Sequence, residues 1–193
     1  MKVLHICLAA FYIDNYSYQE NLLPKYHKKM GLEVEIIASL VSFDKDGKQI
    51  LLPKGKSYIN ENGILVTRLD YKKPKLYQKL RRYIGTYEAI EQSKPDILFI
   101  HGCQFLDIDK VVKYIKRNPH VKVYVDNHAD FSNSARNFIS KNILHKIIWK
   151  RCGHLIEPYT TKFYGVLPAR VDFLKKIYKL PENKVDLLLM GAD

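Results

Sequence analysis

Residues 3–8 read Val-Leu-His-Ile-Cys-Leu, a short run that is apolar at nearly every position. Such a run is typical of a strand that is buried on both faces of a parallel sheet. Over residues 18–30 the apolar side chains instead recur at helical spacing, and Gly31 follows at the position of a helix C-cap. Residues 33–38 have the pattern of another strand. The first 38 residues therefore predict a β-α-β unit.

The alternation of strands and helices continues along the chain. The patterns predict strands at residues 64–69, 96–100, 121–125 and 184–190, short strands at 154–157 and 165–167, and helices at 76–93, 107–118, 134–151 and 171–179. Residues 42–71, where glycines and a proline punctuate short β-rich pieces, are expected to form an insertion or hairpin region. This order predicts an α/β fold: a Rossmann-like, doubly wound, mostly parallel sheet with right-handed crossovers.

In such a sheet, functional residues lie in the loops after the carboxyl ends of the strands, here residues 9–17, 101–106 and 126–133. The first of these loops contains no glycine, whereas a dinucleotide site needs Gly-x-Gly-x-x-Gly so that the backbone can approach the pyrophosphate. No P-loop motif occurs anywhere in the chain. We therefore predict no NAD, FAD or other bound cofactor.

Composition narrows the class of protein. With 193 residues and 47% hydrophobic content, the chain can bury the core of one domain. Its formal charge of +12 favours an anionic partner, such as nucleic acid, an acidic membrane surface or a phosphorylated substrate. Cys7, Cys103 and Cys152 are widely spaced and odd in number, which favours reduced core thiols over a zinc site or a disulfide. We find no signal peptide and no apolar run of roughly 18 residues, and expect a soluble or peripheral protein.

Polar residues at the first helix and after a later strand are candidate ligands for a substrate. Gln19, Glu20 and Asn21 open the first predicted helix, and all three can bond hydroxyl groups. The alternative is a polar first turn in which Glu20 complements the helix dipole. His101 directly follows a predicted strand, so that it points into the cleft or serves as a packing residue. Gly102 beside it permits close approach of a ligand or of another chain segment.

The densest polar cluster begins at Asp126, where the chain reads Asp-Asn-His-Ala-Asp-Phe-Ser-Asn-Ser through Ser134. One interpretation is an Asx-rich turn that caps the next helix through Ser132 or Ser134. Capping would use only one of these residues, and we therefore favour a functional cluster. Its candidate ligands are Asp126, Asn127, His128 and Asp130.

Lysine and arginine residues gather in two segments of the chain. One contains Lys72, Lys73, Lys75, Lys79, Arg81 and Arg82, and the other contains Lys141, Lys146, Lys150 and Arg151 among apolar residues that include Trp149. A basic amphipathic helix with a tryptophan suits an anionic membrane surface, while the alternative is the solvated face of a helix packed on the sheet.

Near the end of the chain, the strand expected at residues 184–190 runs into Gly-Ala-Asp without a covering helix. We expect a domain boundary there.

Three segments together resemble one family: residues 2–6 with Tyr-Gln-Glu-Asn-Leu-Leu at 18–23, Val-Asp-Asn-His-Ala-Asp at 125–130, and Leu-Pro-Glu-Asn-Lys-Val at 180–185 with Gly-Ala-Asp at 191–193. They are similar to the N-terminal domain of the family 4, or group 1, retaining glycosyltransferases of the GT-B fold. In that family two Rossmann-like domains face each other. The N-terminal domain shapes the acceptor site, and the C-terminal domain binds the nucleotide-sugar. The resemblance implies that residues 1–193 form the acceptor-side half, without the C-terminal domain.

The resemblance also implies an activity and a place in the cell. It implies a bacterial-type cytoplasmic enzyme of polysaccharide biosynthesis, peripheral at the inner face of the membrane, which moves a sugar to a glycan or lipid-linked acceptor without a metal. The family's histidine that contacts the transferred sugar corresponds to His128, which we take as the catalytic residue. We expect the substrate-binding residues to be Gln19, Glu20, Asn21, His101, Asp126, Asn127 and Asp130.

The sequence departs from the family in two places. The family's paired glutamates, seven residues apart in the C-terminal domain, have no counterpart here, so this half alone is expected to be inactive. The first loop lacks the Gly-Gly pair of many relatives, which favours a role in acceptor binding for residues 18–23. The rival hypothesis is a non-catalytic basic α/β domain that binds an anionic partner such as nucleic acid. The polar cluster is acidic and amidic rather than basic, so we expect no nucleic-acid partner.

Overall fold

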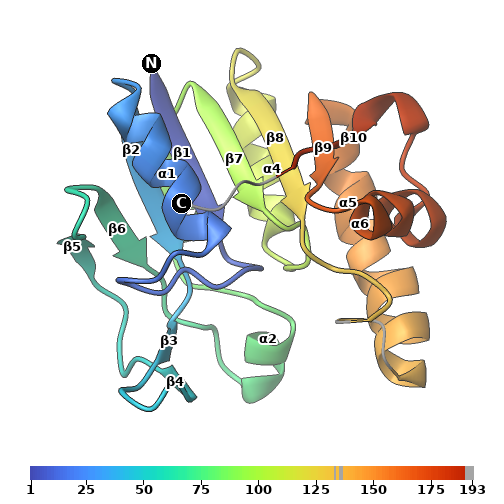
Figure 1. The fold of residues 1–193 in the computed structure, drawn as a ribbon, viewed down its shortest axis with the longest axis horizontal. Coiled ribbons are helices and arrows are strands. Elements are labelled where there is room, and N and C mark those ends of the chain that lie inside the picture. Colours follow the sequence, from blue (N-terminus) through green and yellow to red (C-terminus); the bar gives the residue numbers. More distant parts are fainter. Residues whose placement is uncertain (133, 135–136, 190–193) are drawn as a thin grey trace.

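The computed structural model describes residues 1–132, 134 and 137–189. Its main sheet has the strand order β10-β9-β8-β7-β1-β2-β6-β5 (Figure 1), and the described pairings are parallel except for β5 with β6. The strands are β1 (Lys2–Cys7), β2 (Glu33–Ala38), β3 (Val41–Phe43), β4 (Gln49–Leu51), β5 (Ser57–Ile59), β6 (Leu65–Arg68), β7 (Ile97–His101), β8 (Lys122–Asn127), β9 (Lys162–Gly165) and β10 (Val185–Leu187). The predicted Rossmann-like α/β fold is confirmed.

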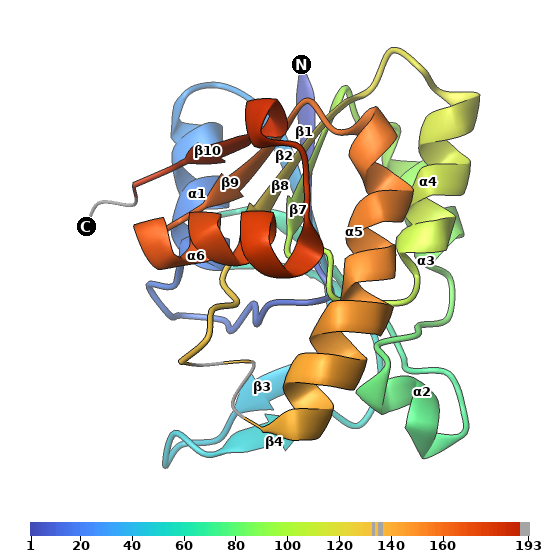
Figure 2. The ribbon, with the colours of Figure 1, turned by 90° about the vertical axis from the view of Figure 1, so that its right-hand side faces the viewer.

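Helices cover both faces of the sheet. They are α1 (Gln19–Lys29), α2 (Lys75–Lys79), α3 (Thr86–Ser93), α4 (Ile108–Arg117), the π-helix η1 (Ile139–Trp149), α5 (Lys150–Ile156), α6 (Pro168–Phe173) and the π-helix η3 (Leu174–Tyr178), with short 3-10 turns η2 (Glu157–Tyr159) and η4 (Glu182–Lys184). Figure 2 shows α1 on one face, with α3, α4 and α5 on the other. The first unit, β1-α1-β2, has the predicted order, and β2 has the predicted bounds.

Strand alternation divides the core between the two faces. Leu4 and Ile6 of β1 belong to the larger cluster on the side of α3, α4 and α5, whereas Cys7 belongs to a smaller cluster with Tyr12 and Val66. The predicted hairpin region forms β3, β4 and β5, with β5 antiparallel to β6. The predicted core thiols are confirmed, because Cys7, Cys103 and Cys152 are free and buried. Among the described helices, none is long and apolar enough to cross a membrane.

The helix predicted over residues 76–93 is wrong, because the segment forms two short helices, α2 and α3. Between them Arg81 and Gly85 have left-handed backbone conformations, with φ of 54° and 81°. Tyr83 lies in this break, is 1% exposed and donates its hydroxyl to the carbonyl of Leu8 at 2.7 Å. A continuous helix could not carry this side chain to the end of β1, so burial of Tyr83 outweighs local helix propensity.

The later helices also differ from the predicted bounds. The strand predicted at residues 154–157 is wrong, since η1 continues as α5 through Gly153 to Ile156. Cys152 and Ile156 of α5 are buried in the larger cluster, and that burial outweighs the low helix propensity of Gly153. The helix predicted at 171–179 begins earlier, at Pro168, and β9 ends at Gly165 instead of spanning 165–167. Strand β10 ends at Leu187, and residues 190–193, including the expected boundary, lie outside the described part.

Candidate functional site

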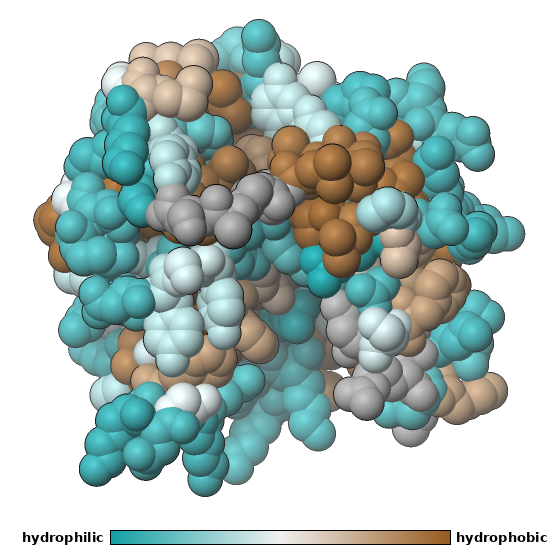
Figure 3. Space-filling view, in the orientation of Figure 1, coloured by the Kyte–Doolittle hydropathy of each residue, from teal (hydrophilic) through white to brown (hydrophobic). Residues whose placement is uncertain are grey.

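A cavity of about 640 Å³ opens at the carboxyl edge of β1, β7 and β8. The predicted loops converge there, as expected for a parallel sheet of this kind. Figure 3 shows the hollow between the first loop and the segment that carries η1. The side chains that shape its wall include Phe11, Tyr18, Glu20, His101, His128 and Trp149.

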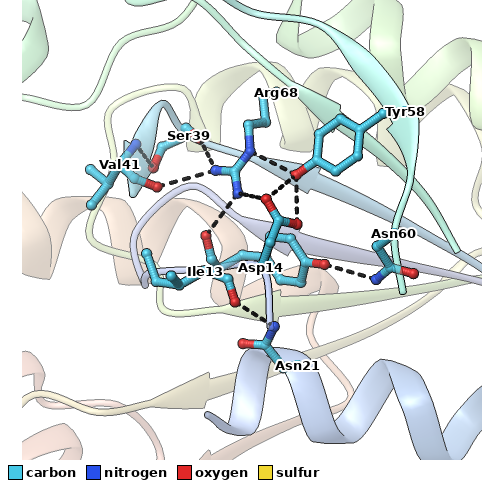
Figure 4. A network of polar contacts seen from close by, with 9 residues as sticks. Ile13, Asp14, Asn21, Ser39, Val41, Tyr58, Asn60 and Arg68 are labelled. Carbon is cyan, nitrogen blue, oxygen red and sulfur yellow. Dashed lines mark hydrogen bonds and ion pairs between the residues drawn. The ribbon is translucent and has the colours of Figure 1, made fainter. Parts of the chain in front are cut away.

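The first loop, which forms one wall of this cavity, is held by the buried guanidinium of Arg68 (Figure 4). Arg68 is 2% exposed and donates to the carbonyls of Ser39, Val41 and Tyr12 at 2.8, 3.1 and 3.3 Å. It also pairs with Asp14 at 3.1 Å. Tyr12 and Asp14 belong to the first loop, whereas Ser39 and Val41 lie where β2 ends and β3 begins, so Arg68 joins the first loop to that junction.

Asn21 anchors the same loop from α1. Its side-chain amide donates to the carbonyl of Ile13 at 2.7 Å, and the residue is 4% exposed (Figure 4). Asn21 does not line the main cavity. Its predicted contact with a substrate stays a prediction, while the structure gives it a role in holding the loop.

Asp126, at the end of β8, is the centre of the polar network. Its Oδ2 atom accepts hydrogen bonds from Gln19 Nε2 and from His101 Nδ1, both at 2.8 Å. Its Oδ1 atom lies 3.4 Å from Nε2 of His128. The structure therefore brings together four of the predicted residues, and Glu20 lies beside them with Oε1 at 3.7 Å from the same nitrogen of His128.

The charges of this network favour an ion pair. Burial alone would raise the pKa of Asp126, but its interactions with His101 and His128 lower that pKa well below its ordinary value. Burial alone would lower the pKa of His128, but Asp126 and then Glu20 raise it above 6.5. The buried carboxylate of Asp126 thus favours the protonated form of His128, whose side chain is 29% exposed.

Glu20, His101 and His128 also offer ligand atoms within 4.8 Å of one another, a spacing that fits a metal ion. However, both ring nitrogens of His101 are already engaged, Nδ1 with Asp126 at 2.8 Å and Nε2 with His5 at 3.0 Å. A metal ion that used His101 would have to break one of these buried hydrogen bonds. The arrangement is therefore described better as a hydrogen-bonded network.

Asn127 and Asp130 hold the turn after β8. The amide of Asn127 donates to the carbonyl of Ala129 at 2.8 Å and accepts from Gln104 Nε2 at 2.9 Å. Oδ1 of Asp130 accepts from the backbone and hydroxyl of Ser132, which is the geometry of an Asx turn. Neither side chain lines the main cavity, so contact of these two residues with a substrate stays a prediction.

Several residues of the site were missed by sequence reasoning. His145, on η1, lines the cavity and contacts the hydroxyl of Tyr178 at 2.9 Å, and burial lowers its pKa to about 4. Trp149, which we considered for a membrane surface, is 4% exposed and forms part of the cavity wall. The guanidinium of Arg81 lies 5.8 Å from the Trp149 ring centre. Spacing in the sequence gave no signal for these contacts, which depend on how η1 packs.

His5 was also missed, although a signal was present. It is a completely buried histidine in the middle of the apolar strand β1, and its ring nitrogens lie 3.0 Å from His101 and from His27. A polar ring in such a strand needs hydrogen-bond partners. That requirement predicts a neighbouring polar group, but the sequence does not identify which one.

No family model and no curated protein sequence matches this chain. Solved structures with a similar fold include the catalytic domain of starch synthase IV from Arabidopsis thaliana bound to ADP and acarbose, with a TM-score of 0.59 and 16% identity over 99% of this chain and 52% of that chain. Sucrose-phosphate synthase from Thermosynechococcus elongatus has a TM-score of 0.60 and 10% sequence identity, and the match covers 100% of this chain and 48% of that chain. A glycosyltransferase from Rickettsia africae has a TM-score of 0.51 and 16% sequence identity, and the match covers 98% of this chain and 43% of that chain. The chain thus spans about half the length of these three proteins, and the likeness is one of fold.

Proposed function

We propose that this chain supplies the acceptor side of a glycosyl transfer from a nucleotide-sugar to a glycan or lipid-linked acceptor. The observation that carries the proposal is the cavity at the carboxyl edge of the sheet, where Glu20, Asp126 and His128 interact beside aromatic side chains. The proposal is also supported by the proteins of similar fold, which are a starch synthase, a sucrose-phosphate synthase and a glycosyltransferase.

The chemistry of the cavity suits a carbohydrate. Sugars present hydroxyl groups, which carboxylates and imidazoles bind, and apolar C–H faces, which pack on aromatic rings. Glu20 and His128 supply the first kind of contact, while Phe11, Tyr18 and Trp149 supply the second around the same cavity. This combination of apolar wall and few polar groups is typical of a small-molecule site.

His128 is the residue that we assign to the transferred sugar. Asp126 and Glu20 raise its pKa above 6.5, which favours the protonated ring that donates hydrogen bonds and carries a positive charge. In the transfer, a bond forms between the acceptor oxygen and the anomeric carbon, the bond from that carbon to the diphosphate oxygen breaks, and the proton of the acceptor hydroxyl passes to the leaving diphosphate. We infer retention of configuration and no need for a metal, with stabilisation of the leaving diphosphate by groups of another domain.

That other domain is the first partner that we propose. The chain spans about half the length of the glycosyltransferase-fold structures it resembles, and its cavity is open at the sheet edge. A second, C-terminal Rossmann-like domain would bind the nucleotide-sugar and close the cavity. Without it we expect no transfer.

The second partner that we propose is the anionic inner surface of the cytoplasmic membrane. On η1, Ile143 and Ile147 are 43% and 61% exposed, and Phe138 just before it is 75% exposed. Lys141 and Lys146 of the same segment are exposed as well. Apolar side chains flanked by lysines favour a surface that carries negative charge, where a lipid-linked acceptor of polysaccharide biosynthesis would be found.

The binding test separates acceptor from donor. Saturation-transfer NMR with a panel of oligosaccharides should detect binding to the 193-residue chain, and replacement of Glu20 by Gln should weaken it. Calorimetry with a panel of nucleotide-sugars should give no binding at micromolar strength, which is about −8 kcal/mol. Micromolar binding of a nucleotide-sugar, or no oligosaccharide contact at the cavity, would contradict the acceptor-side assignment.

A further inference from the structure

Three histidines from three elements form a continuous chain behind the cavity. Nδ1 of His27 on α1 lies 3.0 Å from Nε2 of His5 on β1, and Nδ1 of His5 lies 3.0 Å from Nε2 of His101 on β7. The chain ends at Asp126, whose Oδ2 lies 2.8 Å from Nδ1 of His101. His5, His101 and Asp126 are all 0% exposed, whereas His27 is partly buried at the outer end.

The carboxylate sets the direction of these hydrogen bonds. An ionised Asp126 can only accept, so Nδ1 of His101 carries a proton and donates it. A charge on His101 would be buried completely, and Oδ1 of Asp126 already faces the more exposed ring of His128, so we take His101 as neutral. Its Nε2 is then a bare acceptor.

The same argument extends outward along the chain. Nε2 of His101 accepts from Nδ1 of His5, and His5 is neutral because its complete burial lowers its pKa well below 6.5. Its Nε2 therefore accepts from Nδ1 of His27. The carboxylate of Asp126 thus determines which nitrogen is protonated on His101 of β7, and through it on His5 of β1 and His27 of α1.

We propose that Asp126 orders a tautomer relay in which His101, His5 and His27 are all protonated on Nδ1, and that His5 and His27 are positioning residues for the Asp126–His128 pair. With the relay intact, Oδ2 of Asp126 is held by His101 and its Oδ1 stays toward His128. This role does not rest on glycosyl transfer, because it follows from the buried hydrogen bonds alone.

The relay can be read from the ring nitrogens of the uniformly 15N-labelled chain, since protonated and bare nitrogens differ in 15N shift. At pH 7.5, long-range 1H–15N correlation should give His101, His5 and His27 as Nδ1–H tautomers. His154 is the internal reference, because its Nε2 lies 2.7 Å from the carbonyl of Tyr178 and must be protonated. His120 is exposed and serves as the reference for an unconstrained ring.

Two variants test whether the rings are coupled. In His5→Phe, which keeps an aromatic ring beside Phe99, His27 should lose its Nδ1–H tautomer while His101 keeps it. In Asp126→Leu, His101 has no carboxylate to donate to, and His27 should change tautomer although two rings separate it from the substitution. His120 and His154 should be unchanged in both variants.

The wild-type spectrum alone can overturn the relay, even where a variant fails to fold. An Nε2–H tautomer for His5 or His27 in the unmodified chain would contradict the proposed direction. In folded variants, an unchanged His27 in both His5→Phe and Asp126→Leu would show that the rings are not coupled. His27→Gln is a milder variant, since its amide can still donate to His5, and His5 should then remain protonated on Nδ1.

Discussion

Nδ1 of His101 lies 2.8 Å from Oδ2 of Asp126, and neither side chain is exposed to solvent. A buried carboxylate without partners would be strongly disfavoured, so the neighbouring side chains must supply the hydrogen bonds that water would otherwise give. Gln19 and His101 both donate to Oδ2, and His128 faces Oδ1. The pair therefore ties α1, β7 and the loop after β8 into one site.

Replacement of His128 by Ala should lower glycosyl-transfer turnover by about 100-fold or more in the protein with its donor-binding domain, because the group assigned to the sugar is lost. The melting temperature should fall only modestly, because the buried Asp126 loses one neighbour but keeps its hydrogen bonds from Gln19 and His101. His120→Ala, at an exposed position, is the control. A collapse in stability with normal activity per folded molecule would instead make His128 a packing residue.

Acid should destabilise the fold in part through His145. Because its pKa is lowered from 6.5 to about 4 by burial, the unfolded chain binds the proton first as the pH falls. The stability that the neutral ring contributes is present above pH 6.5 and is lost progressively down to about pH 4. His5 and His27 shift in the same direction, whereas His128 shifts in the opposite one.

His145→Gln keeps a partner for the hydroxyl of Tyr178 but cannot titrate. Denaturant titrations give the free energy of unfolding at pH 7.5 and at pH 5. The loss of this free energy between the two pH values should be about 1–2 kcal/mol smaller in His145→Gln than in the wild type. The exposed His120→Gln should leave the difference between the two pH values unchanged. An identical pH dependence in wild type and His145→Gln would show that His145 is not held neutral.

Arg68→Met should lower the free energy of unfolding by about 3 kcal/mol or more. Arg68 is buried, and its loss removes the donor to the carbonyls of Ser39 and Val41 and the cationic partner of Asp14, which keeps the hydroxyl of Tyr58. Lys176→Met is the control, because the Lys176 side chain is 66% exposed and its pair with Asp172 should be worth less than about 0.5 kcal/mol. A loss below about 1 kcal/mol for Arg68→Met would contradict its role in holding the first loop.

Gly102→Ala tests the close packing behind the cavity. Gly102 has a φ of 83°, and a Cβ atom there would lie 2.5 Å from Oε1 of Gln104 and 3.1 Å from Cβ of Ala9. Gln104 would have to leave its bonds to Asn127 and Tyr178, so the variant should lose about 2–3 kcal/mol. Gly47→Ala, with φ of 74° and no atom within 4 Å, should lose only about 1 kcal/mol from backbone strain. Equal losses in urea titrations of the two variants would remove the steric argument.

The sequence was informative where local pattern and tertiary contact agree. Strands such as residues 3–8 are apolar on both faces, and burial in a parallel sheet demands that pattern, so their positions could be predicted. Asp126 and His128 could be found because polar residues gather where β8 ends, and the convergence of those loops follows from the parallel topology.

The sequence did not predict features that depend on contacts between residues far apart in the chain. The break at Tyr83 depends on a bond to Leu8, and the partners of His5 lie 22 and 96 residues away in the chain. The inner face of η1 follows π-helical spacing, so that Leu144 and Trp149, five residues apart, both face the core. A pattern of 3.6 residues per turn would place Leu144 on one face with Ile143 and Ile147, but these two side chains are exposed.

The division of η1 into an inner and an outer face supports a test for membrane binding. The apolar residues do not have to serve the core and the membrane at once, because Leu144 and Trp149 pack inward while Ile143 and Ile147 are exposed. Each lysine near an anionic bilayer contributes on the order of 1 kcal/mol, so several must act together, and attachment should be weak and sensitive to salt. In cosedimentation, liposomes with anionic lipid should bind the chain, and Lys146→Glu with Lys150→Glu should weaken binding. Equal binding to neutral liposomes, or no binding to anionic ones at low salt, would exclude this role, and binding of nucleic acid instead would favour the rival basic domain.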